Sequence, residues 1–165
     1  MNRTASLLGL SAWLGISFAA GFSGTFFMPG EWYESLRKPA WNPPHWIFGP
    51  VWSALYAMMA VAAWSVWRPK GFTAAKLPLT LFLLQLALNA TWTPLFFGLQ
   101  RPGSAMICIA LLWLAILTTL IEFRKVSPMA TALMIPYLAW VTFASALNFE
   151  LWRLNASTTA TWFVV

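Results

Sequence analysis

The chain has 165 residues, of which 60% are hydrophobic and 8% are charged, and its formal net charge is +6. Soluble domains carry ~25% charged residues, so this composition excludes a soluble protein and indicates an integral membrane protein with one domain. The Lys and Arg residues are scattered at the ends of apolar runs, where they would meet lipid headgroups, so the positive charge does not indicate nucleic-acid binding.

Five apolar runs are each long enough to cross a membrane, which takes ~20 residues. We expect spans at about residues 5–28, 45–67, 77–99, 104–123 and 128–152. The first run is longer than the ~7 to 15 apolar residues of a signal peptide, so we expect it to be retained. The pattern therefore predicts an all-α integral membrane protein, a five-transmembrane-helix bundle over residues 1–155, followed by a C-terminal tail at 156–165.

Some of these runs carry features of their own. Pro94 interrupts the third run and should leave the carbonyl of Ala90 without its usual helical partner. The fourth run is rich in Leu and Ile, and we expect it to face lipid. Between the first two runs lies a segment with several prolines and tryptophans. We expect it to form a lid loop over residues 29–44, because prolines reduce the entropy lost when a loop is ordered.

Several kinds of chemistry are excluded by the residues present. Cys108 stands alone in an apolar run and His45 is the only histidine, so we expect no disulfide framework and no metal site. Glu122 and Glu150 lie near the ends of spans, and no charge is placed at the middle of one. This argues against ion-driven transport and against most hydrolytic chemistry, which need charged or basic groups inside the membrane.

Three spans carry aromatic and polar residues at spacings of three and four, which places them on one face of a helix. These faces consist of Phe48, Trp52, Tyr56 and Met59, then Asn89, Trp92, Thr93 and Phe96, then Tyr137, Trp140, Ala144 and Asn148. Such faces suit a pocket for a flat, mostly apolar ligand. The alternative is an interfacial belt and core packing, which is the usual role of membrane tryptophans.

The asparagines on two of these faces need partners. Asn89 and Asn148 lie inside apolar spans, where an unsatisfied amide is costly. A neighbouring helix, a backbone carbonyl freed by a proline, or a ligand could supply the hydrogen bonds, and bonding between helices is the commoner outcome. Ala144 is a small residue between Trp140 and Asn148, so it leaves space that a larger side chain would close.

Four stretches carry a resemblance to a known family: EWYESLRKP, WNPPHWIFGPVWSALY, LALNATWTPLFFG and PYLAWVTFASALNFELWRLN. They resemble the translocator protein family, also called TspO/MBR or tryptophan-rich sensory proteins, and the likeness extends from Ala5 to Asn155. The resemblance implies a five-helix bundle, often a homodimer, with a pocket open toward the first loop. It implies porphyrins such as protoporphyrin IX or haem, cholesterol and benzodiazepine-type compounds as ligands, with no required cofactor.

The positions of this chain that match ligand contacts of the family are Tyr33, Trp52, Asn89, Trp92, Trp140 and Ala144. Together with the helix faces they give the predicted ligand-binding set: Tyr33, Trp52, Tyr56, Asn89, Trp92, Phe96, Tyr137, Trp140, Ala144 and Asn148. The favoured function is a porphyrin-binding receptor or sensor with a role in tetrapyrrole transport or regulation. Light-dependent degradation of protoporphyrin IX is the alternative that the resemblance implies, and Trp52 and Trp140 would then be catalytic.

Two further expectations concern the propionates of a bound porphyrin and the binding of cholesterol. We expect porphyrin propionates near Arg37, Lys38 or His45, and we favour an interfacial role for His45 over haem ligation. The sterol pattern of the family needs a tyrosine where this chain has Phe149, so cholesterol binding should be weakened. We favour the bacterial cell envelope over the mitochondrial outer membrane as the location.

Overall fold

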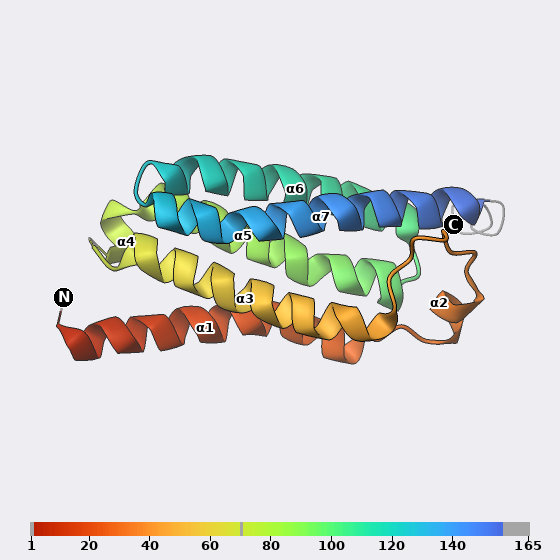
Figure 1. The fold of residues 1–165 in the computed structure, drawn as a ribbon, viewed down its shortest axis with the longest axis horizontal. Coiled ribbons are helices and arrows are strands. Elements are labelled where there is room, and N and C mark those ends of the chain that lie inside the picture. Colours follow the sequence, from red (N-terminus) through yellow and green to blue (C-terminus); the bar gives the residue numbers. More distant parts are fainter. Residues whose placement is uncertain (1, 70, 157–165) are drawn as a thin grey trace.

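Five long helices run side by side along the molecule in the computed structural model, which describes residues 2–69 and 71–156 (Figure 1). They are α1 (Arg3–Phe26), α3 (His45–Trp67), α5 (Lys76–Thr93), α6 (Pro102–Arg124) and α7 (Pro128–Leu154). Three short elements lie between them: α2 (Glu31–Ser35), α4 (Gly71–Ala74) and the π-helix η1 (Pro94–Gly98). The predicted all-α five-helix membrane fold is confirmed. Of the predicted tail at 156–165, residues 157–165 lie outside the described residues.

Local sequence explains where these helices begin. The side chain of Asn2 accepts a hydrogen bond from the backbone N–H of Ala5 at 2.8 Å, which caps the start of α1. Ser127 does the same for α7 through the N–H of Ala130 at 3.2 Å. The first residue of α6 is Pro102, whose missing N–H would have no partner in the first turn in any case.

The five long helices are arranged in a ring, and each packs mainly against two neighbours. Around the bundle α1 packs against α3, α3 against α7, α7 against α6, α6 against α5 and α5 against α1. Helices far apart in the sequence, such as α3 and α7, are therefore neighbours. The interior of the half near α4 is filled by side chains that are almost fully buried: Met59, Val66, Leu79, Phe82, Ile116, Phe123 and Met134.

The fourth span does not face lipid as a whole, so this expectation is wrong for half of the helix. One face of α6 is buried between α5 and α7 and includes Ile109, Leu112 and Ile116. The opposite face, with Ile107 and Leu111, is exposed. Leu and Ile suit a lipid-facing surface and a helix-packing surface equally well in a membrane, because lipid tails are as apolar as these side chains.

Pro94 widens the helix turn at the end of α5. The π-helix η1 begins at this residue, and the N–H of Leu99 donates to the carbonyl of Pro94 at 2.8 Å, five residues earlier. Single π turns of this kind are frequent at functional sites. Here the turn carries Phe96 and Phe97, whose rings both contact the ring of Tyr33 between the first two spans.

Candidate ligand-binding site

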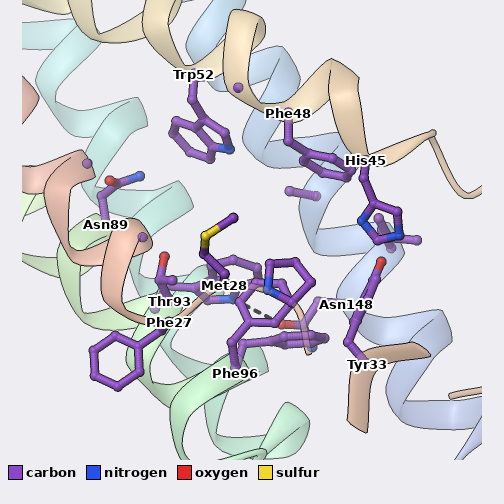
Figure 2. Close-up of a pocket in the computed structure, with 18 of the residues that line it drawn as sticks. Phe27, Met28, Tyr33, His45, Phe48, Trp52, Asn89, Thr93, Phe96 and Asn148 are labelled. Atoms are coloured by element: carbon purple, nitrogen blue, oxygen red, sulfur yellow. Dashed lines mark hydrogen bonds between the residues drawn. The ribbon is translucent and has the colours of Figure 1, made fainter. Parts of the chain in front are cut away.

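A cavity of about 590 Å³ lies at the loop end of the bundle, within the size range of small-molecule sites (Figure 2). Its walls come from the end of α1, the first half of α3, the end of α5 with η1, and the second half of α7, and the short helix α2 adds Tyr33 and Glu34. The described part of α6 contributes no lining residue. The cavity therefore lies away from the tightly packed end of the bundle.

The structure brings most of the predicted ligand-binding residues to this one cavity. Those that line it are Tyr33, Trp52, Tyr56, Asn89, Trp92, Phe96, Trp140, Ala144 and Asn148. Tyr137 does not line it, because the side chain is fully buried behind Trp52, with the two ring centroids 6.1 Å apart. That these residues contact a ligand remains a prediction.

A chain of hydrogen bonds forms the floor of the cavity and joins three helices. The hydroxyl of Tyr56 donates to Oδ1 of Asn89 at 2.7 Å, and Nδ2 of Asn89 donates to the hydroxyl oxygen of Tyr137 at 3.2 Å. The indole of Trp52 is stacked on the Tyr56 ring, with centroids 5.4 Å apart and planes inclined by 27°. The amide of Asn89 is thus satisfied by neighbouring helices, which fixes the orientation of the aromatic rings around it.

The second asparagine fixes a tryptophan in the wall. Oδ1 of Asn148 accepts a hydrogen bond from Nε1 of Trp92 at 3.0 Å, and its Nδ2 donates to the carbonyl of Pro102 at 2.9 Å. Trp92 in turn stacks on Phe96, with centroids 5.1 Å apart. The wall formed by α5 and η1 is therefore pre-organised by a residue of α7. This reduces the conformational entropy that is lost when a ligand binds.

The wall contributed by α7, which packs against α3, is built around Trp140. Its ring meets Phe48 of α3 edge to face at a centroid distance of 5.9 Å and lies 5.4 Å from Phe143. Its Nε1 is buried and has no hydrogen-bond partner among the described residues. Ala144 follows one turn later and also lines the cavity, as expected for a small residue that leaves space beside an indole.

Tyr33 attaches the lid loop to the cavity. It lies on α2 and is only 4% exposed, and its hydroxyl is 3.2 Å from Oδ1 of Asn42 in the same loop. Its ring contacts Phe97 at a centroid distance of 5.4 Å. Burial raises the pKa of the Tyr33 hydroxyl, which therefore stays protonated and able to donate to Asn42 at neutral pH.

The mouth of the cavity carries both acidic and basic side chains. Oε1 of Glu34 is 3.0 Å from Nε2 of His45, and Oε2 is 3.2 Å from Nζ of Lys38. Glu34 and His45 line the cavity, whereas Arg37 and Lys38 do not. Of the three groups expected to receive propionates, only His45 thus faces the cavity directly.

Sequence reasoning missed the wall contributed by the end of α1. Gly21, Gly24, Phe27 and Met28 line the cavity there. The ring of Tyr56 lies where a Cβ on Gly21 would be, whereas a Cβ on Gly24 would have no atom within 4 Å. Small residues four apart, such as Ser17 and Gly21, allow close helix packing, which Gly21 provides, but such spacing gives no indication of an open space at Gly24.

Comparison with known proteins places this fold in a family. A family model described as TspO/MBR matches residues 11–153. The translocator protein of Homo sapiens is 45% identical over 139 residues, 81% of this chain and 82% of that protein. Protein CrtK of Rhodobacter capsulatus is 44% identical over 140 residues, 82% of this chain and 86% of that protein.

A further relative matches almost end to end. The tryptophan-rich protein TspO of Chlorobaculum tepidum is 42% identical over 162 residues, 94% of this chain and 99% of that protein. The family model, the relatives and the five apolar helices agree. The chain belongs to the TspO/MBR family of multi-pass membrane proteins.

Proposed function

We propose that this protein binds a metal-free porphyrin of the protoporphyrin IX type in the cavity and acts as a membrane sensor or carrier of tetrapyrroles. The observation that supports this most directly is the aromatic lining of a cavity of about 590 Å³, with Trp52, Trp92 and Trp140 on three different helices. A flat macrocycle can stack on such rings from more than one side.

The expected affinity follows from these contacts. An aromatic pair contributes ~0.5 to 1.5 kcal/mol beyond the burial of apolar area. Several such contacts, added to the burial of a large apolar ring, suffice for the ~8 kcal/mol of a micromolar complex. The hydrogen bonds that hold Trp92 and Tyr56 in place reduce the entropy lost on binding.

His45 is the reason for proposing a metal-free porphyrin over haem as the ligand. Haem iron is commonly held by a histidine nitrogen, and His45 is the only histidine of the chain. Its Nε2 lies 3.0 Å from a carboxylate oxygen of Glu34, so ligation through this atom would have to break that contact. Iron ligation through Nε2 would thus compete with Glu34, whereas contact with the ring faces of a metal-free porphyrin would not.

A titration with protoporphyrin IX tests the proposal. The purified protein in detergent should show saturable quenching of tryptophan fluorescence, because energy is transferred from the indoles to the bound porphyrin. Replacing both Trp52 and Trp140 by Phe should weaken binding by about 10-fold, since two stacking surfaces become smaller. Quenching that does not saturate, or equal affinity in the double variant, would contradict the assignment of the site.

Light-dependent degradation of the bound porphyrin is a second candidate. It is favoured by the placement of Trp52 on α3 and Trp140 on α7, both in the cavity lining and therefore both within reach of one ligand. Illumination of the complex should then give a product pattern that differs from that of free porphyrin in the same detergent. Identical patterns in the two samples would show that the protein is not the catalyst.

A further inference from the structure

The mouth of the cavity holds a carboxylate of the protein itself next to a histidine, the one basic side chain among the described residues that line the cavity. Glu34, on α2, reaches Nε2 of His45 at the start of α3, with 3.0 Å between nitrogen and oxygen. His45 lies beside Tyr33 at the rim (Figure 2). The position that a ligand carboxylate would take beside His45 is thus occupied by Glu34.

Glu34 also has a second partner. Its other carboxylate oxygen is 3.2 Å from Nζ of Lys38, which additionally donates to the Glu34 carbonyl at 3.1 Å. Lys38 lies over the Tyr33 ring at 4.8 Å from the centroid and is outside the cavity lining. Glu34 can therefore leave His45 and keep a cationic partner, so that its charge stays compensated when a ligand arrives.

We propose that Glu34 is a built-in competitor for the acid groups of the ligand, and that it sets how strongly the site prefers acids over uncharged molecules. This rests on the proposed porphyrin function. An acid-bearing porphyrin must displace the Glu34 carboxylate from His45, with exchange of one hydrogen-bonded partner for another. A porphyrin ester has no carboxylate to place there, and it binds with the Glu34–His45 contact intact.

The exposure of these groups sets the size of the effect. The side chain of Glu34 is 60% exposed and that of His45 is 49% exposed, so water screens the contact and keeps it exchangeable. Gain or loss of an exposed ion pair of this kind changes a binding constant by only a small factor. Removal of the competing charge should therefore raise affinity for an acid by about 2- to 5-fold.

The experiment compares protoporphyrin IX with its dimethyl ester in wild type, Glu34→Gln, His45→Ala and the double variant. Glu34→Gln should bind the diacid more tightly and the diester as wild type does. His45→Ala should lose affinity for the diacid only. In the His45→Ala background, Glu34→Gln should have no further effect on the diacid, because the group for which the two carboxylates compete is gone.

The chain offers a matched control in Glu31→Gln. Glu31 lies on the same short helix, is exposed, and forms no ion pair within the described part of the chain and no part of the cavity lining. If Glu31→Gln raises diacid affinity as much as Glu34→Gln, the effect comes from overall charge and the inference fails. It also fails if Glu34→Gln changes diacid and diester affinity equally. Failure of the wild type to bind either porphyrin would instead overturn the proposed function.

Discussion

Asn155, at the end of α7, binds the backbone of Arg37 in the lid loop through both ends of its side-chain amide. Its Oδ1 accepts from the N–H of Arg37 at 3.0 Å, and its Nδ2 donates to the carbonyl of the same residue, also at 3.0 Å. Nδ2 also donates to the carbonyl of Leu151 at 2.8 Å, so the amide is held in one orientation. The amide of Asn155 thus ties the loop to the end of the last helix.

Replacement of Asn155 should therefore loosen the loop. In Asn155→Asp a carboxylate oxygen would face the Arg37 carbonyl, and in Asn155→Ala both bonds to Arg37 and the bond to Leu151 are lost. Each hydrogen bond contributes ~0.5 to 1.5 kcal/mol. We expect porphyrin dissociation to become about 5- to 10-fold faster and amide hydrogens of residues 29–44 to exchange faster. Arg153→Ala, which removes only an exposed pair with Glu150, is the control and should leave both rates unchanged.

A larger side chain at Gly24 should fill the cavity without disturbing the helices. A Cβ at this position has no atom within 4 Å, and the residue lines the cavity. Gly24→Leu should weaken porphyrin binding by at least about 10-fold, because a leucine takes up space that the ring needs. Gly15→Leu is the matched control: it is on the same helix, equally open, and outside the cavity. Equal affinities in fluorescence titrations of the two variants would contradict the assignment of the α1 wall.

Asn89 should be important for stability because it bridges two buried tyrosines. Asn89→Leu leaves the hydroxyls of Tyr56 and Tyr137 without this partner, and an unsatisfied buried group destabilises by ~1 to 3 kcal/mol. Thermal unfolding in detergent should show this loss, and Thr91→Val on the exposed face of α5 should not. Adding Tyr56→Phe and Tyr137→Phe to Asn89→Leu should restore part of the stability, since no hydroxyl then remains unpaired. A further loss in the triple variant would contradict the bridge.

The lid should respond to pH through Tyr33. Burial raises the pKa of its hydroxyl above the ordinary 10.0. The folded loop therefore prefers the neutral phenol. Its contribution to stability is fully present below pH 10.0 and is lost as the pH rises through the raised pKa.

The difference in tyrosinate absorbance between wild type and Tyr33→Phe isolates this titration, because only three tyrosines are present. It should have a midpoint above pH 10.0, and hydrogen exchange in residues 29–44 should accelerate over the same range. A midpoint at or below 10.0 would show that Tyr33 is not buried in the folded loop.

The spans and three of the cavity walls could be predicted because they depend on local pattern. Aromatic residues three and four apart, such as Trp52 and Tyr56, share a helix face whatever surrounds the helix. The exceptions on these faces are Met59 and Tyr137, which are fully buried and do not line the cavity. Which side of an aromatic stripe meets open space depends on the tilt and spacing of helices, and residue spacing carries no information on either.

The remaining wall could not be predicted for a different reason. Gly24 lines the cavity because it has no side chain. A glycine at this position in the sequence would look the same whether a helix or an empty space lay opposite it. Gly21, one turn earlier, is the same residue type, but the Tyr56 ring lies where its Cβ would be. The burial of one face of α6 was missed similarly, because the buried Leu112 and the exposed Leu111 are the same residue type and differ only in what lies beside them.

The closure of the helix ring also has a consequence for biosynthesis. The cavity takes walls from α1 and from α7, and α1 leaves the ribosome four long helices before α7. A nascent chain that lacks α7 has neither Trp140 nor the amide of Asn148 that holds Trp92. A ligand can thus stabilise only the finished protein, and its presence during synthesis should raise the yield of complete, correctly inserted molecules without affecting partial ones.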